Sequence, residues 1–389
     1  MLVAKIIFWI SLFFLFYAYI GYALITALLL KLSKTKNVSF NKDDLPGVTM
    51  LIAAYNEELF IEKKIEDTLA LDYPKDRLQI IFITDGSSDA TPALVAKHKE
   101  VELLHQPERR GKSAALNRAI AFAKQPIIVI CDANTILNKE CLKELVKYYS
   151  DKRVGGVAGE KRVISQDGLA GQEGVYWKYE SALKKLDAKY CTIVGAAGEL
   201  FSCRKDLWTH VEDDAILDDF MISMRIVQKG YQVKYEPLAY ALETASASVK
   251  EESKRKVRIA AGGFQSMSRL LPMLNIFKYG KSSFLYISHR VLRWAVCPFC
   301  LVFALLSGII LGIFSGNIFY QVAMVLQLTA YIAIFLGQTA LFSKMKIPFV
   351  KPLYYFVFMN ICVIRGFFRY LRGKQTATWE RAQRQTMIA

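Results

Sequence analysis

The sequence predicts an α/β domain with a mostly parallel central sheet, flanked by transmembrane helices. Three observations lead to this prediction. An unbroken apolar run in the segment 126–134 stops at a carboxylate, similar runs alternate with helical patterns from about residue 40 to 260, and long uncharged stretches lie toward both ends. Uninterrupted apolar runs are typical of strands buried on both faces of a parallel sheet. Alternating strands and helices favour right-handed crossovers between neighbouring parallel strands.

The first membrane segment is predicted at residues 6–30, which carry no charge and are long enough to span a bilayer. A cleaved signal peptide would have a shorter apolar region. Lys31, Lys34 and Lys36 follow at once, and the positive-inside rule then places the next domain in the cytoplasm. We therefore expect an N-terminal transmembrane helix in 1–36, followed by a cytoplasmic domain over 37–265.

Two further apolar runs, 294–313 and 318–342, predict a transmembrane hairpin within 292–343, preceded by interfacial helices in 266–291. A fourth run, 352–368, contains Asn360 and Arg365 and is followed by a basic tail. A full span there would place the tail outside, against the charge rule. We therefore expect 344–389 to form a membrane-associated or re-entrant helix and a basic cytoplasmic tail.

The chain has 389 residues, is 53% hydrophobic and carries a formal net charge of +16. The basic residues flank the apolar runs, where they fit anionic lipid headgroups. We therefore expect membrane lipids as partners and no nucleic acid. The CxxC spacing at 297–300 lies inside an apolar run, which argues against a metal or redox role.

The predicted strands and helices alternate along the central domain. Strands are expected within 48–58, where the apolar run ends in a polar cluster, and at 78–84, 102–104 and 127–131. Helices are expected at 57–70, from Thr91, and at 112–123. Asp132 closes the last of these strands, at the edge where α/β sheets bind ligands. Asn134 can point a second oxygen to the same side, and two hard oxygens suit Mg²⁺ or Mn²⁺. The alternative is an ordinary Asx turn after a strand.

The segment DGSSD at 85–89 closes the second strand. Asp85 can accept a hydrogen bond from a uracil N–H or a ribose hydroxyl, and Gly86 lets the backbone come close to a ligand. An ordinary turn between strand and helix would use the same residues. The basic segment 109–113 precedes a helix, and Lys112 can reach a phosphate there, although a solvated charge run is also possible.

Three later segments carry further candidate residues. Small residues in 193–201 allow close approach to a sugar, or close packing of helix on strand. Four carboxylates fall within 213–219, just before an amphipathic helix; one of them could act as a base, with its pKa raised by its neighbours. Arg255 and Arg258 share one helix face that could grip a pyrophosphate, or could bind headgroups beside the membrane.

The order of these motifs resembles the family 2 inverting glycosyltransferases with the GT-A fold. YNEE, DGSSD, GK followed by AALN, DAN, GAAGE, DD-F and RKVR occur in this order over roughly residues 46–265. The membrane-integrated branch of that family includes cellulose, hyaluronan and poly-N-acetylglucosamine synthases. The resemblance implies a nucleotide-sugar donor, a Mg²⁺ or Mn²⁺ cofactor, and a glycan or lipid-linked acceptor.

The resemblance also assigns roles by position. Asp219 corresponds to the catalytic base, Asp132 to the first acid of the DxD metal motif, and Asn134 to a metal ligand beside it. Arg255 and Arg258 occupy positions of the QxxRW motif and would hold the donor diphosphate. The residues assigned to the nucleotide are Ala53, Tyr55, Glu57, Asp85, Lys112 and Asp132. Those assigned to the donor or acceptor sugar are Gly198, Glu199, Asp218 and Trp379.

The chain departs from the family pattern in three places. Asn134 replaces the second DxD acid, while Arg255 and Ile259 replace the Gln and Trp of QxxRW. In processive synthases that Trp lies at the acceptor terminus, so polymerisation does not follow from the resemblance. We therefore expect an inverting transferase that uses a nucleotide diphosphate sugar, with a UDP-linked donor, at the cytoplasmic membrane face. The rivals are a polyprenyl-phosphate monoglycosyltransferase and a non-catalytic membrane scaffold with the same fold.

Overall fold

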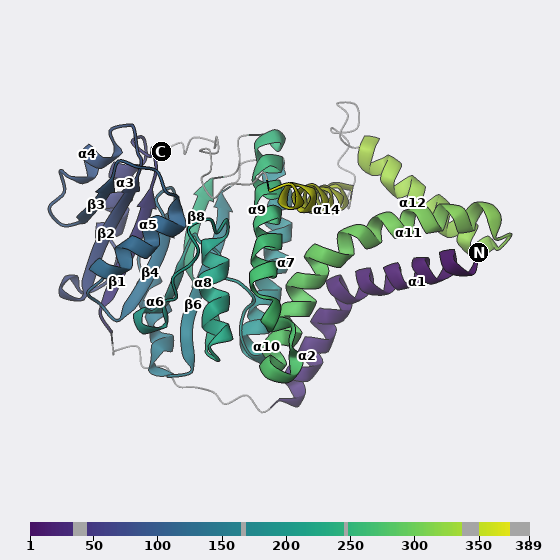
Figure 1. Cartoon of the computed structure of the whole chain (residues 1–389), viewed down its shortest axis with the longest axis horizontal. Coiled ribbons are helices and arrows are strands. Elements are labelled where there is room, and N and C mark those ends of the chain that lie inside the picture. The colour runs from purple at the N-terminus through teal and green to yellow at the C-terminus, as the bar shows by residue number, and fades with distance from the viewer. Residues whose placement is uncertain (34–44, 165–168, 245–247, 337–349, 374–389) are drawn as a thin grey trace.

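A computed structural model describes residues 1–33, 45–164, 169–244, 248–336 and 350–373. Within them one eight-stranded sheet forms the central domain, with strand order β3-β2-β1-β4-β7-β6-β8-β5 (Figure 1). The strands are β1 Val48–Ala54, β2 Leu78–Asp85, β3 Glu102–Gln106, β4 Ile127–Asp132, β5 Ile136–Leu137, β6 Val154–Ile164, β7 Phe201–Arg204 and β8 Gln232–Thr244.

Most strand pairs are parallel, as predicted. β1 pairs in parallel with β2 and β4, β2 with β3, and β6 with β8, while β7 is antiparallel to β4 and β6, and β5 to β8. The register sets Ala53 opposite Asp132 and Ala54 opposite Thr84. The carboxyl ends of β1, β2 and β4 therefore meet at one edge of the sheet, with Asp85 and Asp132 on it.

The apolar run of β4 is buried on both faces of the sheet, as predicted. Ile128 and Ile130 belong to one core cluster, while Ile127, Val129 and Cys131 belong to the other. Side chains alternate across a strand, so this division means that each face of β4 is covered by its own apolar layer. The buried strand fixes the position of the carboxylate that follows it.

The helices of the central domain follow the predicted alternation with shifted ends. The first begins at Ile61, because the N–H groups of Phe60 and Ile61 bond to Glu57 O in a preceding turn. The predicted helix 112–123 ends in a 3₁₀ turn, η3 Ile120–Phe122. The α-helices are α3 Ile61–Leu69, α4 Thr91–Val95, α5 Lys112–Ala119, α6 Cys141–Val146, α7 Leu169–Tyr190, α8 Asp218–Gln228 and α9 Val249–Arg269. The remaining 3₁₀ turns are η2 Lys75–Arg77, η4 Lys147–Ser150, η5 Lys205–Leu207 and η6 Leu271–Leu274.

Three helical segments of the described chain are long and apolar enough to cross a membrane: Leu2–Leu32, Ile276–Phe314 and Ile318–Leu336. The second segment begins earlier than the predicted hairpin arm at 294, because the π-helical turn η7 directly follows the preceding helix, which is itself kinked at Gly280. α1 and α11 lie side by side (Figure 1). The elements are α1 Leu2–Phe16, η1 Tyr17–Gly21, α2 Tyr22–Leu32, α10 Ile276–Tyr286, η7 Ile287–Val296, α11 Cys297–Phe314 and α12 Ile318–Leu336.

The last described helix, α14 Val350–Leu371, packs along α9 and also contacts α7 and α11 (Figure 1). The contact with α9 is close at Gly366, where an added Cβ would lie 2.4 Å from Ala260 Cβ. α14 is absent from the three candidate spans of the described chain. Its contacts join it to the central domain, and the assignment of 344–389 to the membrane surface stays a prediction.

A buried polar network ties the central domain to the membrane helices. Asp187 on α7 accepts a hydrogen bond from Tyr22 OH at 2.5 Å and lies 2.5 Å from His289 Nδ1. Glu180, about two turns earlier on the same face of α7, lies 3.3 Å from His289 Nε2 and 2.6 Å from Arg293 Nη1. Buried charges require such partners, so this network fixes the position of α7 against α2 and η7.

Candidate active site

A small pocket opens at the end of β2, around Asp85. Asp85 Oδ2 accepts hydrogen bonds from the backbone N–H groups of Arg110 at 3.0 Å and Gly111 at 2.6 Å. Oδ1 is buried and has no hydrogen-bond partner among the described residues. A buried acceptor left unpaired is costly, so Oδ1 is suited to a ligand N–H or O–H. The pocket is lined by Ala53, Ala54, Tyr55, Ile83, Asp85, Arg109, Gly111, Lys112 and Ala115.

One wall of this pocket is a stacked pair. The Arg109 guanidinium carbon lies 3.7 Å from the centre of the Tyr55 ring, a cation–π contact. Gly86, with φ +69°, is the residue that admits this loop, because an added Cβ would lie 2.5 Å from Arg109 Cβ. The sequence predicts that a ligand approaches Gly86 closely. In the structure the approaching atoms belong to Arg109, so Gly86 shapes the pocket indirectly.

Glu57 lies in a loop next to this pocket and is absent from the lining residues described above. Its backbone N–H donates to Thr91 Oγ1 at 2.8 Å, and Glu58 N–H donates to Asp89 Oδ2 at 3.1 Å. Asp89 Oδ1 in turn accepts from Thr91 N–H at 3.0 Å. These bonds hold the loop after β1 against the loop after β2, which positions the rim of the pocket.

Lys112 lines the Asp85 pocket and also contacts Asp132, the acid predicted to bind a metal ion. Its Nζ lies 2.6 Å from Asp132 Oδ1 and 3.6 Å from Asp218 Oδ2. Burial alone would lower the pKa of Lys112, but Asp132, Asp218 and Asp219 together raise it above its ordinary value. A cation at the first residue of helix α5 is opposed by the helix dipole, so these carboxylates hold it there.

Asp219 is half-buried in the first turn of α8. Burial raises the pKa of Asp219 to about 7, the neighbouring Asp218 adds to the rise, and Lys112 opposes it. A Cβ added to Gly198 would lie 3.2 Å from both Asp219 Oδ2 and Lys112 Nζ, so Gly198 leaves room beside these two groups. A carboxylate with a pKa near neutrality is suited to proton transfer at physiological pH.

The structure gives Arg255 and Arg258 different surroundings. Burial lowers the pKa of Arg258, whereas attraction to Asp218 and Asp219 opposes that effect, so Arg258 lies toward the acids. Arg255 instead lies 3.5 Å from Glu243 and 3.2 Å from Glu252. Of the two arginines, Arg258 is therefore the one whose charge is attracted to Asp218 and Asp219.

Glu199 belongs to a chain of ion pairs rather than standing alone. Lys161 pairs with both Glu199 and Glu243, and Glu243 continues to Arg255. Burial alone would raise the pKa of Glu199, but the Lys161 ammonium holds it below its ordinary value. Glu199 is therefore ionised and held beside the acids, since it also contributes to the raised pKa of Asp132.

Sequence reasoning missed a cluster around Trp177. The ammonium groups of Lys161, Lys184 and Lys256 lie 5.5, 5.9 and 5.7 Å from the centre of its ring. These residues come from β6, α7 and α9, so no spacing along the chain could reveal the cluster. Lys184 is also buried, near Glu199 and Asp219, and burial lowers its pKa.

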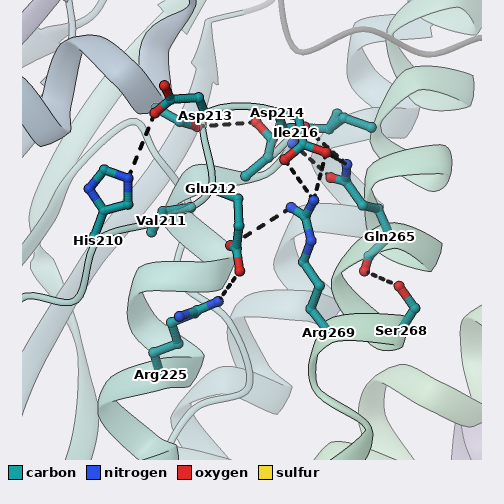
Figure 2. A network of polar contacts seen from close by, with 12 residues as sticks. His210, Val211, Glu212, Asp213, Asp214, Ile216, Arg225, Gln265, Ser268 and Arg269 are labelled. Atoms are coloured by element: carbon teal, nitrogen blue, oxygen red, sulfur yellow. Dashed lines mark hydrogen bonds and ion pairs between the residues drawn. The ribbon is translucent and has the colours of Figure 1, made fainter.

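The four acids predicted within 213–219 form two pairs with different contacts. Asp213 and Asp214 make surface ion pairs, with Arg110 at 3.2 Å and Arg269 at 2.7 Å respectively. Figure 2 shows the second pair together with Gln265, which accepts from Ile216 N–H and thereby joins the loop to α9. The surface pairs anchor the loop, while Asp218 and Asp219 lie beside Lys112.

Asn134 and Trp379 are the remaining predicted site residues. Asn134 is half-buried in the turn after β4 and stays a predicted metal ligand. Trp379 lies outside the described residues.

Within the described ranges no three His, Cys, Asp or Glu side chains form a metal cage. However, Asp218 Oδ2 is buried without a hydrogen bond, and the Lys112 ammonium lies between it and Asp132. These carboxylates fit Mg²⁺ or Mn²⁺ when donor phosphates supply the other ligands.

The sheet of this chain has the GT-A-like fold of glycosyltransferases, and three of its described helical segments are long and apolar enough to cross a membrane. Residues 49–208 match the family model described as glycosyl transferase family 2. A mannosyltransferase, PcManGT from Pyrobaculum calidifontis, solved with GDP-Man and Mn²⁺, has a similar fold. The TM-score is 0.73, the identity is 22%, and the match covers 95% of this chain and 100% of that one.

Two relatives with curated descriptions are similar to this chain in sequence. The poly-β-1,6-N-acetyl-D-glucosamine synthase of Staphylococcus aureus strain COL is 31% identical over 249 residues, which are 62% of this chain and 60% of the relative. The chain thus matches about three fifths of the length of these relatives. A probable glycosyltransferase of Bacillus subtilis, YdaM, is 26% identical over 384 residues, with 88% of both chains covered.

Proposed function

We propose that this protein transfers a sugar from a UDP-linked nucleotide sugar to an acceptor at the cytoplasmic face of the membrane, with inversion at the anomeric carbon. The observation that supports this most strongly is the convergence at one sheet edge. The Asp85 pocket, the Lys112–Asp132 pair and the half-buried Asp219 share Lys112 as their common neighbour. A nucleoside, a diphosphate and a reacting hydroxyl need these three kinds of partner in this order.

Each residue then has a specific task. Asp85 Oδ1 accepts a hydrogen bond from the base or ribose, and Tyr55 with Arg109 forms the flat wall beside it. Lys112 and Arg258 supply positive charge near the diphosphate. Asp219 removes the proton of the acceptor hydroxyl, whose oxygen attacks the anomeric carbon from the face opposite the diphosphate. The bond from that carbon to the diphosphate oxygen breaks, and UDP leaves.

Mg²⁺ or Mn²⁺, held by Asp132 with Asn134 or Asp218 and by donor phosphates, would add Lewis-acid stabilisation of the leaving group. The arrangement of protein charges is compatible with this role, because Lys112 already occupies a cation position among carboxylates. Lys112 and a divalent ion would then share the negative charge of Asp132, Asp218 and the diphosphate.

The test is a panel of nucleotide sugars incubated with the purified full-length membrane protein, scoring nucleotide release and product with and without Mn²⁺. UDP release from one sugar donor, with product of inverted anomeric configuration, supports the proposal. Retained configuration would exclude the direct displacement. Turnover of GDP donors in preference to UDP donors would show that uracil is not the nucleobase that the site binds. Metal-dependent UDP release would also exclude the non-catalytic scaffold.

A further inference from the structure

A second, larger cavity lies where α7, η7 and α14 meet the N-terminal helix. Its volume is about 200 Å³, and it is partly open to the surroundings. None of its described lining residues is acidic. The lining consists of six aromatic rings, three apolar side chains, one amide and two guanidinium groups: Tyr19, Tyr176, Tyr179, Trp294, Tyr355, Phe356, Pro352, Met359, Val363, Asn360, Arg290 and Arg293.

The polar groups of this wall largely bond to each other or to the protein behind them. Tyr19 OH donates to Asn360 Oδ1 at 3.4 Å, and Asn360 Nδ2 donates to Phe356 O at 2.8 Å. Tyr179 OH donates to Tyr19 O at 2.8 Å, and Tyr176 OH to Glu180 Oε1 at 3.3 Å. The wall therefore presents ring faces and methylene groups to the cavity, which suits a hydrocarbon chain better than a chain of sugars.

The exception is the pair of guanidinium groups. Arg290 and Arg293 lie 3.5 and 2.6 Å from the two oxygens of Glu180, the one carboxylate within ion-pair distance of either arginine in the described chain. Glu180 also contacts His289, which in turn pairs with Asp187, so the two arginines share this carboxylate with a third group. An anionic group on the ligand would give Arg290 a second partner, and arginine is well suited to phosphate.

The arginine end of the cavity adjoins the proposed base. Trp294 lies 5.5 Å from the ring of Phe220, which directly follows Asp219 in α8. Gly263 on α9 makes room for Trp294, because an added Cβ would lie 2.6 Å from the indole. Arg290 Nε also donates to Val194 O at 3.0 Å, in the loop that leads to Gly198. A ligand at this end is thus one side-chain layer from the site of transfer.

The walls of the cavity include two candidate membrane spans. Tyr19 belongs to Leu2–Leu32, and Arg290, Arg293 and Trp294 belong to Ile276–Phe314. We propose that this cavity binds the hydrocarbon chain of a phosphate-bearing membrane lipid that carries the acceptor, with the phosphate at Arg290. The proposal rests on the transferase function above and gives its acceptor class. The acceptor oxygen belongs to the lipid head group, and it bonds to the anomeric carbon as the bond to UDP breaks.

Binding of farnesyl phosphate, a short polyprenyl phosphate, to the full-length protein in phosphatidylcholine nanodiscs tests this. Met359→Trp fills the cavity, and Ile361→Trp is the matched control, because Ile361 on the same helix is 50% exposed. We expect saturable binding to wild type and I361W, and weakening by about tenfold or more in M359W. Farnesol should bind at least about tenfold more weakly than farnesyl phosphate, and inorganic phosphate should not compete. Equal binding by M359W and wild type would overturn the proposal, as would full competition by inorganic phosphate.

A measurement on the wild-type protein covers the case in which M359W does not fold. A photoreactive benzophenone analogue of farnesyl phosphate should label peptides of α7, η7 or α14, and labelling confined to α12 would overturn the assignment. UDP binding is measured on the same samples. Lipid binding without UDP binding would remove the transferase proposal but leave the lipid site, whereas UDP binding without lipid binding would do the reverse.

Discussion

Lys112 Nζ lies 2.6 Å from Asp132 Oδ1 and 3.6 Å from Asp218 Oδ2, so one cation lies between acids from β4 and α8. Asp132 ends a strand and Asp218 begins a helix 86 positions later in the sequence. The contact through Lys112 is what makes the two acids parts of one site. It also predicts that the acids repel each other when the ammonium is removed.

Lys112→Met should therefore destabilise the fold by about 1–3 kcal/mol without divalent cation, because it leaves buried carboxylates without their partner. Thermal unfolding of the purified protein measures this, and added Mn²⁺ should recover part of the loss. Lys124→Met is the control. Its ammonium pairs with Glu102 on the surface, 71% exposed, so its loss should change stability little. Equal effects of the two substitutions would contradict the central position of Lys112.

Asp219→Asn should reduce sugar transfer by about 10²–10⁴-fold, because the amide cannot accept the acceptor proton. UDP binding should be unchanged, since Asp219 is not part of the nucleoside pocket. Steady-state transfer and UDP titration are measured on the same preparation. Asp213→Asn, which removes a surface ion pair in the same loop, is the control and should keep most of the activity. Near-normal transfer by D219N would remove Asp219 from the role of base.

The pH dependence of kcat/KM should also show whether Asp219 is the base. The pKa of Asp219 is raised to about 7, and a base acts only when deprotonated, so kcat/KM should fall about tenfold per pH unit below that value. The raised pKa also means that the folded state holds this proton more tightly than the unfolded state. The contribution of Asp219 to stability therefore declines as pH rises toward 7, and D219N should have the higher Tm at pH 8 but not at pH 4. A flat profile between pH 5 and 8 would contradict this.

Asp85→Asn should weaken UDP binding by about ten- to a hundredfold, because it replaces a charged acceptor that fixes two backbone N–H groups and offers Oδ1 to the ligand. Isothermal titration of UDP provides the measurement. Asp206→Asn changes an exposed acid and should have no effect. If D85N binds UDP like the wild type, the pocket around Asp85 does not hold the nucleoside.

Glu180→Gln should destabilise the full-length protein by about 3–5 kcal/mol, because it leaves the buried Arg293 and the half-buried Arg290 without a carboxylate. Thermal unfolding in detergent measures the change. Glu251→Gln, which removes a surface pair with the exposed Lys254, is the control. An effect of E180Q no larger than that of E251Q would show that the network between α7 and the membrane helices contributes little.

The sequence by itself determined the parallel sheet, because uninterrupted β-branched runs such as 127–131 can be buried on both faces only inside such a sheet. It also determined the three apolar runs at 6–30, 294–313 and 318–342, whose length and lack of charge depend on no tertiary contact. The positions of Asp85 and Asp132 at strand ends followed from the same pattern.

Tertiary structure alone decided which residues share a site. Sequence spacing treated Asp213, Asp214, Asp218 and Asp219 alike, and treated Arg255 and Arg258 as one pair, because neighbours in sequence are equivalent until packing chooses a face. In the folded chain Asp213 pairs with Arg110 and Asp214 with Arg269. Arg255 instead pairs with Glu243. The Trp177 cluster includes Lys256, 79 positions later in the sequence, and the cavity at Trp294 includes Tyr19, 275 positions earlier, so their chemistry exists only once the helices pack.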